Sequence, residues 1–307
     1  MPDLRTTWMG LSLPTPVVLG ASPLAHDVEA VAAAVAAGAG AVVMYSLFEE
    51  QVVNEQMAAH HFIDARMDAD AEAAGFLPDV DVFSLGAEPD LAQLQRLKER
   101  VAVPVIASLN GVTPGGWTEY ARACEVRGAD ALELNLYDVV TSAEENAHRV
   151  EERQLEVVHA VVHAVDIPVT VKIGPAYTSV PAFVRRLKLS TPAELPQRLH
   201  ALAVLSPTAA VALACTGGVH SGHDAAKALL CGAHVVQVTS AVLQHGPGQL
   251  RPIVDGLRAW LAETGYVSSD EARGVLAMGS TRDASVWERL NYVRMLDGWR
   301  MERVPRG

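Results

Sequence analysis

Short apolar runs alternate along the chain with longer Ala-rich stretches that carry polar residues at helical spacing. The stretches at 28–37, 117–127 and 151–165 predict helices. The runs between them are rich in Val, Ile and Leu and predict strands at 17–22, 41–46, 103–111, 131–137 and 167–173. Continuous apolar strands that alternate with helices indicate a parallel α/β sheet with both faces covered.

The dipeptide Gly-Ala precedes three of the expected strands, at Gly40-Ala41, Gly128-Ala129 and Gly232-Ala233. Glycine ends a helix readily, and alanine begins the next strand with little bulk. This repeated unit favours one barrel over two separate domains, and no linker rich in Pro or Ser divides the chain. We therefore expect a single domain over residues 1–307 with the (β/α)8 TIM-barrel fold.

Two adjacent strand-to-helix turns are predicted in the second half of the chain. An apolar run ends in Gly217 and Gly218, a helix follows over 223–232, and the next strand ends in Thr239 and Ser240. Such turns can direct several backbone N–H groups at one phosphate. In a (β/α)8 barrel the phosphate site lies after the seventh and eighth strands. The pair of turns therefore predicts a phosphorylated ligand.

Two segments depart from the alternation. Residues 48–89 form a long insertion after the second strand, and its acidic middle contains His60 and His61. These histidines are expected on a solvated helical face rather than at a metal site. Residues 252–307 form a C-terminal helical extension with helices at 252–264, 269–277 and 285–300.

Composition narrows the class of protein. Half of the 307 residues are hydrophobic, which permits a large core, and the net charge of -12 argues against a nucleic-acid surface. No apolar run reaches the roughly 18 residues that a membrane span needs. The N-terminus lacks the order of a signal peptide, so a cytoplasmic location is expected. The three scattered cysteines predict reduced, buried thiols and no metal site.

The expected strand ends carry an ordered set of motifs. They are LGASPL at 19–24, YSLFEEQ at 45–51, IASLNG at 106–111, LELN at 132–135 and VTVKI at 169–173, followed by the two turns described above. In this order they resemble the dihydroorotate dehydrogenase family of FMN-binding barrels, from about Leu11 to Arg300. The resemblance implies FMN across the C-terminal mouth of the barrel. It also implies an oxidoreductase that transfers a hydride from an unknown small substrate to the flavin.

The resemblance further implies roles for the strand-end residues. Asn110 and Asn135 would bond the flavin edge or the substrate, and Lys172 would lie near flavin N1 and O2, where a positive charge stabilises the reduced anionic ring. The catalytic candidates are Asp138, Lys172 and Asn135. The cofactor-binding candidates are Ala21, Ser22, Ser46, Asn110, Asn135 and Lys172 around the ring, with Gly217, Gly218, Thr239 and Ser240 at the phosphate.

The chain departs from the family pattern at two strand ends. The family places a catalytic Cys or Ser just after the position of Asn135, whereas this chain offers Asp138. Asp138 is either a base or a loop carboxylate, and the change argues against dihydroorotate as the substrate. The Lys that the family dehydrogenases carry near the end of the second strand is replaced by Tyr45 and Ser46.

The chain is also short between the fifth and seventh strands. From Gly174 to Ala209 the only strand candidate is the basic run Arg185 to Leu189, and a helix start follows at Ser190. A barrel without its sixth strand has two unpaired edges. Either this run fills the gap, a partner chain closes it, or the barrel is incomplete. Loss of the sixth strand should uncover one side of the flavin.

Two other functions stay open at this point. The chain can be a barrel that has lost flavin and serves as a binding or structural protein. It can also be a flavin-free lyase or isomerase that uses Tyr137, Asp138 and Lys172 at the same mouth. We expect a small-molecule substrate, no nucleic-acid or membrane partner, and a homodimer. The aromatic residues of the C-terminal extension either anchor the dimer or cap the barrel's own helices; they are Trp287, Tyr292 and Trp299.

Overall fold

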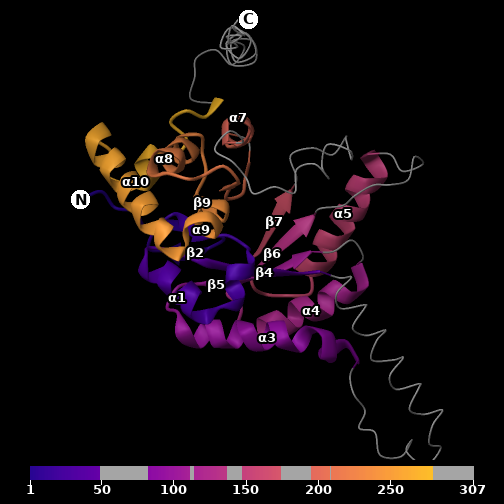
Figure 1. Cartoon of the computed structure of the whole chain (residues 1–307). Helices are drawn as coiled ribbons and strands as arrows, with labels where there is room; N and C mark the ends of the chain where they lie inside the picture. The colour runs from indigo at the N-terminus through magenta and orange to yellow at the C-terminus, as the bar shows by residue number, and fades with distance from the viewer. Residues whose placement is uncertain (49–81, 111–113, 137–146, 174–194, 208, 279–307) are drawn as a thin grey trace, which may run out of the picture.

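The computed structural model describes residues 1–48, 82–110, 114–136, 147–173, 195–207 and 209–278. Its centre is a curved parallel sheet with helices on the outer side (Figure 1). The strands of this sheet are β3 (Val17–Leu19), β4 (Val42–Phe48), β5 (Val105–Asn110), β6 (Ala131–Leu136), β7 (Val169–Ile173), β8 (Ala214–Thr216) and β9 (Val235–Val238). The predicted alternation of strands and helices is confirmed in these residues.

Helices follow the strands on the outside of the sheet. In chain order the helical elements are η1 (Pro23–His26), α1 (Val28–Ala36), α3 (Val82–Arg100), α4 (Pro114–Val126), α5 (Ala147–Val162), α7 (Leu195–Leu205), α8 (Gly222–Leu230), α9 (Ser240–His245), η4 (Pro247–Gln249), α10 (Leu250–Thr264) and α11 (Ser269–Ala272). Local sequence sets several helix starts. Asp27 accepts bonds from the backbone N–H groups of Glu29 and Ala30, and Ser221 forms a capping box with Asp224.

The strand order shows that the sheet curls back on itself. Five strands run in sequence from β3 to β7, and β9 pairs with β3 on the other side, followed by β8, which gives the order β7-β6-β5-β4-β3-β9-β8. This is the order of a (β/α)8 barrel in which the described strands leave one position between β7 and β8 unfilled. The TIM-barrel prediction is therefore confirmed as a barrel-like fold. The proposed sixth strand, Arg185 to Leu189, lies outside the described residues and stays a prediction.

Side chains alternate between the two faces of the sheet and divide the core in two. On β3, for example, Val17 and Leu19 pack outward against the helices, in the larger cluster of buried residues. Val18, Val43 and Ile106 point the other way and belong to a smaller cluster inside the curl, with Ala131 and Val235. Because of this alternation, polar side chains nearer the carboxyl ends of the strands face the same interior space.

An N-terminal hairpin closes the interior cluster. The strands β1 (Thr6–Trp8) and β2 (Leu11–Leu13) pair antiparallel, and Trp8 and Leu13 are buried with the inward residues of the sheet. Its two-residue turn holds Met9 at φ 54° and Gly10 at φ 78°. The sequence pattern does not predict this hairpin, because only one of the two left-handed turn positions carries a typical Gly, Asn or Asp.

The described C-terminal helices cover only part of the predicted extension. The helix α10 matches the predicted segment 252–264, and α11 covers the start of the predicted segment 269–277. The third predicted helix and the aromatic anchors Trp287, Tyr292 and Trp299 lie outside the described residues, as does most of the insertion 48–89. The last part of that insertion, from Val82 onward, belongs to α3. Within the described residues no helix is long and apolar enough to cross a membrane.

The helices α8 and α10 cross with almost no room between their backbones. A Cβ atom added to Gly222 would lie 2.3 Å from the backbone C of Gly256 and 2.3 Å from the N of Leu257. Real Cβ atoms do not approach backbone atoms this closely, so α8 would have to move away from α10.

We predict that Gly222→Ala lowers the free energy of unfolding by about 1–3 kcal/mol, the usual cost of overpacking. Denaturant unfolding followed by circular dichroism measures the loss. Gly248→Ala is the matched control, because a Cβ atom there meets nothing within 4 Å. Equal stability of the two variants would contradict the close helix crossing.

Candidate active site at the carboxyl ends of the strands

The structure brings the predicted strand-end residues to one edge of the curved sheet. Each of them lies at or just after the carboxyl end of its strand, the edge where TIM-barrel active sites are built. They are Ala21 and Ser22 after β3, Ser46 on β4, Asn110 on β5, Asn135 on β6, Lys172 on β7, Gly217 and Gly218 after β8, and Thr239 and Ser240 after β9. Asp138 and Tyr137 lie outside the described residues.

Three buried polar side chains form a hydrogen-bonded cluster under this edge. The hydroxyl oxygens of Ser46 and Ser108 lie 2.8 Å apart. The Asn135 side-chain nitrogen donates to both, at 2.8 Å and 2.9 Å, and lies 3.3 Å from the carbonyl oxygen of Leu109. Because a backbone carbonyl only accepts hydrogen bonds, this last contact identifies the atom as the nitrogen.

The other end of the Asn135 amide meets no partner among the described residues. Its oxygen Oδ1 is buried and accepts no hydrogen bond within the described part of the chain, and the same is true of the Ser22 hydroxyl. A buried polar atom without a partner costs about 1–3 kcal/mol, so native proteins rarely leave one unused. The Asn135 oxygen is therefore a candidate acceptor for a ligand N–H group.

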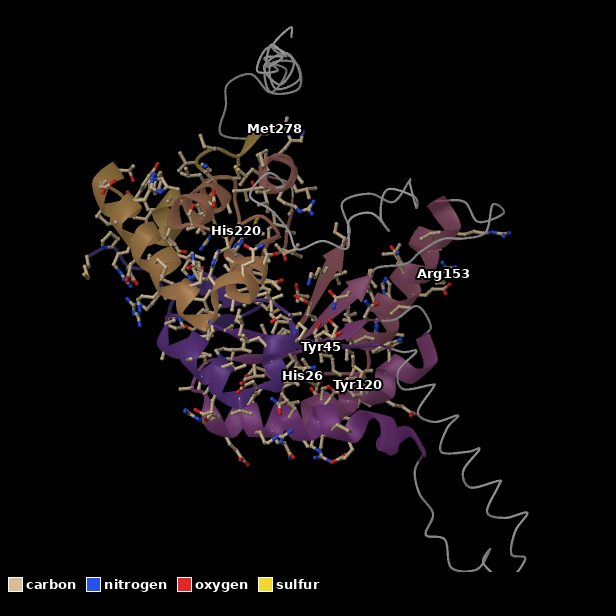
Figure 2. All side chains as sticks on the ribbon, viewed as in Figure 1. His26, Tyr45, Tyr120, Arg153, His220 and Met278 are labelled. Carbon is tan, nitrogen blue, oxygen red and sulfur yellow. The ribbon has the colours of Figure 1, made fainter. Side chains whose placement is uncertain are left out.

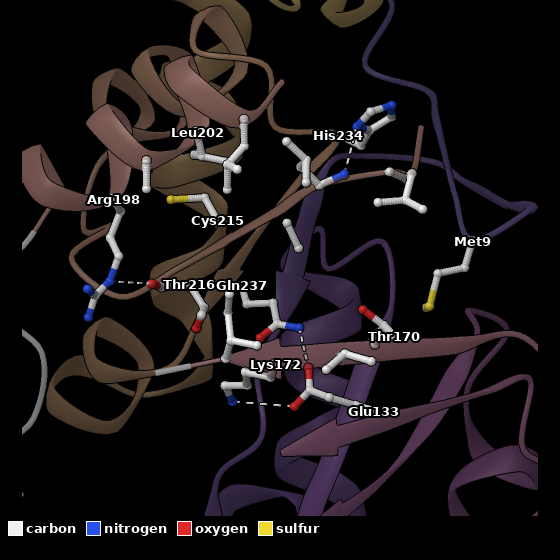
Figure 3. A pocket seen from close by; sticks show the side chains of 18 of the residues that line it. Met9, Glu133, Thr170, Lys172, Arg198, Leu202, Cys215, Thr216, His234 and Gln237 are labelled. Carbon is white, nitrogen blue, oxygen red and sulfur yellow. Dashed lines mark hydrogen bonds and ion pairs between the residues drawn. The ribbon is translucent and has the colours of Figure 1, made fainter. Parts of the chain in front are cut away.

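A second polar group crosses the interior of the sheet (Figure 3). Glu133 on β6 is 1% exposed, and its Oε1 lies 3.3 Å from the Lys172 Nζ on the neighbouring strand β7. Its Oε2 accepts a 2.6 Å hydrogen bond from the Gln237 Nε2 on β9. Both carboxylate oxygens are therefore held, from two sides of the curled sheet.

The turns after β8 and β9 bring backbone close to the same edge. Gly217 and Gly218 take φ values of 93° and 80°, which side chains with a Cβ atom rarely adopt. A Cβ atom on Gly20, just after β3, would lie 2.3 Å from the Thr239 hydroxyl, so the chain ends of β3 and β9 nearly touch. At Gly20 and Gly218 there is thus no room for a side chain.

A large cavity extends from this polar group along the open flank of the barrel. Its volume is about 1230 Å³, and it is lined by all five residues of β7 together with parts of α7, β8 and the N-terminal hairpin. Glu133, Lys172 and Gln237 lie at one side of it (Figure 3). On the outer face of β7, Val171 and Ile173 are 38% and 58% exposed. The described part of the sheet is thus open beside the candidate site.

Aromatic side chains lie at the strand end that departs from the family pattern. The rings of Tyr45 on β4 and His26 on η1 are 5.0 Å apart and tilted by 52° (Figure 2). Tyr45 thus packs against the short helix after β3. The Ser46 hydroxyl, not Tyr45, faces the polar interior.

Comparison with known proteins identifies the family. No family model matches the chain. It is 30% identical over 236 residues to a protein of Aeropyrum pernix named as a dihydroorotate dehydrogenase A (fumarate), covering 66% of this chain and 77% of that protein. It is 27% identical over 237 residues to the catalytic subunit of dihydroorotate dehydrogenase B (NAD(+)) of Methanothermobacter thermautotrophicus, covering 66% and 77%. The chain belongs to the dihydroorotate dehydrogenase family.

A further relative has a different named activity. The chain is 25% identical over 319 residues to the NAD-dependent dihydropyrimidine dehydrogenase subunit PreA of Escherichia coli strain K12, covering 89% of this chain and 76% of that protein. Family membership therefore spans more than one named reaction. The predicted resemblance to dihydroorotate dehydrogenases is confirmed.

The sequence motifs predict most of the strand-end residues but not three polar residues that point inward. Ser108 and Glu133 lie inside the motifs that carry the family resemblance, and Gln237 lies in an apolar strand, yet none was predicted as a site residue. The available signal was a polar residue at an inward position of an otherwise apolar strand. In this dehydrogenase family member, that signal marks the polar interior at the barrel mouth.

The three cysteines are unpaired and buried, as the sequence predicts. Cys124, Cys215 and Cys231 are free and buried. Burial raises the pKa of Cys124 and of Cys215 to about 12 and that of Cys231 to about 11, so these thiols stay protonated. In the described ranges, no group of three or more His, Cys, Asp and Glu side chains could hold a metal ion.

We predict that Asn135→Leu lowers the free energy of unfolding by about 1–3 kcal/mol, because the Ser46 and Ser108 hydroxyls lose their shared donor in a buried site. Thermal and denaturant unfolding of the purified protein measure this change. The control Gln244→Leu replaces an exposed amide and should change stability by less than about 0.5 kcal/mol. A loss no larger than that of the control would contradict the buried cluster.

A pH-dependent prediction concerns His234, which lines the cavity. Burial, and then the nearby Arg273 charge, lower its pKa, and its Nδ1 accepts the Leu213 N–H at 3.1 Å. The folded state therefore binds its proton less readily than the unfolded state. We predict that this contribution to stability is full well above pH 6.5, the ordinary histidine value, and is lost as the pH falls below it.

The variant His234→Asn isolates this effect, because an amide oxygen can accept the same N–H without titrating. Between pH 8 and pH 5, the free energy of unfolding should fall more for the unaltered protein than for the variant. An identical pH dependence in both proteins would contradict the role of His234.

Proposed function

We propose that the chain is an FMN-dependent oxidoreductase that transfers a hydride from a small substrate to the flavin. Support comes from the dehydrogenase names of its relatives. Further support comes from the gathering of the predicted residues at the carboxyl edge of the sheet. Dihydroorotate is not proposed as the substrate, because Asp138 stands where the family motif places a catalytic Cys or Ser.

The observation that carries the proposal is the polar interior at the mouth of the barrel. It offers a buried acceptor without a partner, the Asn135 Oδ1, and a half-buried cation, the Lys172 ammonium. The pyrimidine portion of a flavin presents one N–H donor between two carbonyl acceptors. Among the described residues the Asn135 Oδ1 has no donor, which a flavin N–H would supply, and the Lys172 ammonium is a cation suited to a flavin carbonyl, so the residues present fit the group.

Each predicted residue then has a task toward the cofactor. FMN, when bound, would supply the two-electron chemistry by accepting the hydride. The Lys172 ammonium would stabilise negative charge on the reduced ring, and Asn135 and Asn110 would orient the ring or the substrate. Ala21, Ser22 and Ser46 would support it from below. Gly217, Gly218, Thr239 and Ser240 would hold the phosphate through backbone and hydroxyl groups.

The remaining predictions are part of this proposal. Asp138 would take the substrate proton as a general base. The open flank between β7 and β8 would leave one side of the bound flavin accessible, which the large cavity there supports. A homodimer and a cytoplasmic location are kept as proposals.

We predict that FMN added to the purified full-length chain gives a bound flavin spectrum and raises the melting temperature by several degrees, as ligand binding to the folded state requires. Lys172→Gln should lower affinity for reduced FMN by about tenfold, since it removes the cation expected beside the anionic ring. The control Lys227→Gln alters an exposed lysine on α8 and should bind like the unaltered protein.

A protein that FMN neither colours nor stabilises would contradict the proposed function. That outcome would favour the alternative of a barrel that keeps the fold and has lost redox chemistry.

A further inference from the structure

We propose that Glu133 is a positioning residue that holds the Lys172 ammonium at the barrel mouth and sets how much positive charge it presents to a flavin. This inference rests on the proposed function and deepens it. In the same site, it assigns to Glu133 an influence on how tightly the reduced flavin binds relative to the oxidised flavin.

The geometry fixes both atoms of the carboxylate. The Glu133 side chain is 1% exposed, while the Lys172 side chain is 19% exposed. One oxygen lies 3.3 Å from the ammonium, and the other accepts the 2.6 Å bond from Gln237. Because Gln237 comes from β9, across the curl from β6, the carboxylate cannot turn away from Lys172 without losing a short bond.

Stability of the fold alone does not require the charged pair of Glu133 and Lys172 at this place. Replacing a buried ion pair by apolar side chains is often neutral or stabilising, because desolvation offsets the attraction. The inward positions nearer the N-terminal hairpin, such as Val43, Ile106 and Ala131, are filled by apolar side chains. By contrast, the ion pair of Lys98 and Asp130 lies outside the barrel and is half-buried.

The electrostatic consequence has a definite sign. A carboxylate next to the ammonium offsets its charge, so the pair presents less positive charge to a ligand than Lys172 alone would. A bound flavin would therefore gain less stabilisation of its anionic reduced form. Removing the Glu133 charge should shift binding toward the reduced cofactor.

The first experiment compares reduced and oxidised FMN in the full-length protein. We predict that Glu133→Gln, which keeps the side-chain shape and an oxygen for the Gln237 N–H, raises the ratio of affinities for reduced over oxidised FMN by about tenfold. That ratio corresponds to a midpoint potential about 30 mV higher for a two-electron couple. Dye-equilibrated reduction followed by absorbance measures it. The control Glu263→Gln removes an exposed carboxylate of α10 and should leave the potential unchanged.

A double variant tests whether Glu133 acts through Lys172. In the Lys172→Gln background, the Glu133 carboxylate has no ammonium whose charge it could offset. Adding Glu133→Gln there should cause no further shift. A full shift in that background would overturn the assignment of Glu133 to Lys172.

The second experiment needs no flavin. An amine-reactive acylating reagent with mass-spectrometric readout measures the labelling rate of Lys172 in the protein without FMN. We predict about a tenfold faster rate in Glu133→Gln, because an ammonium without its carboxylate loses its proton more easily. Glu133→Asp keeps the charge but shortens the side chain, and should give an intermediate rate. It also serves if Glu133→Gln does not fold.

The outcomes separate the two proposals. Unchanged labelling overturns the positioning role, and faster labelling with an unchanged potential overturns the redox control. Failure of the unaltered protein to bind FMN contradicts the proposed function and the redox control with it. In that case the labelling rate still decides whether Glu133 positions Lys172.

Discussion

The structure depends on the alternation of side chains in a curled parallel sheet. Each strand sends every second residue inward, and the curl makes these residues meet. Near the N-terminal hairpin the inward residues are apolar and pack against Trp8 and Leu13. Toward the carboxyl ends they become Ser108, Glu133 and Asn135. The packed apolar side chains support the buried polar groups that lie next to them.

The polar layer is held together across the barrel as well as along neighbouring strands. Asn135 joins β6 to β4 and β5 through Ser46 and Ser108, and Glu133 joins β6 to β7 and β9. The contacts of Glu133 cross the interior of the curled sheet, in which the described strands leave one position open. The open flank therefore borders the same side chains that would set the charge around a cofactor.

Much of this fold follows from local pattern. Apolar runs predicted the strands β3 to β9 because parallel strands are buried on both faces, and Gly-Ala pairs marked the helix ends. The ordered motifs predicted which residues reach the carboxyl edge. The hairpin was missed because its strands span only 3 residues each and its turn begins with Met9. Glu133 and Gln237 were missed because they lie 104 residues apart in sequence.

The sequence by itself determined the strand and helix order, the family and the strand-end residues, because periodicity and motif spacing are local properties. Only the tertiary structure decided that Glu133 contacts both Lys172 and Gln237, and that the Asn135 oxygen has no partner in the described part of the chain. It also decided that the flank between β7 and β8 borders a cavity. Hydrogen bonds and cavities of this kind depend on how the sheet curls, and no single stretch of sequence specifies that curvature.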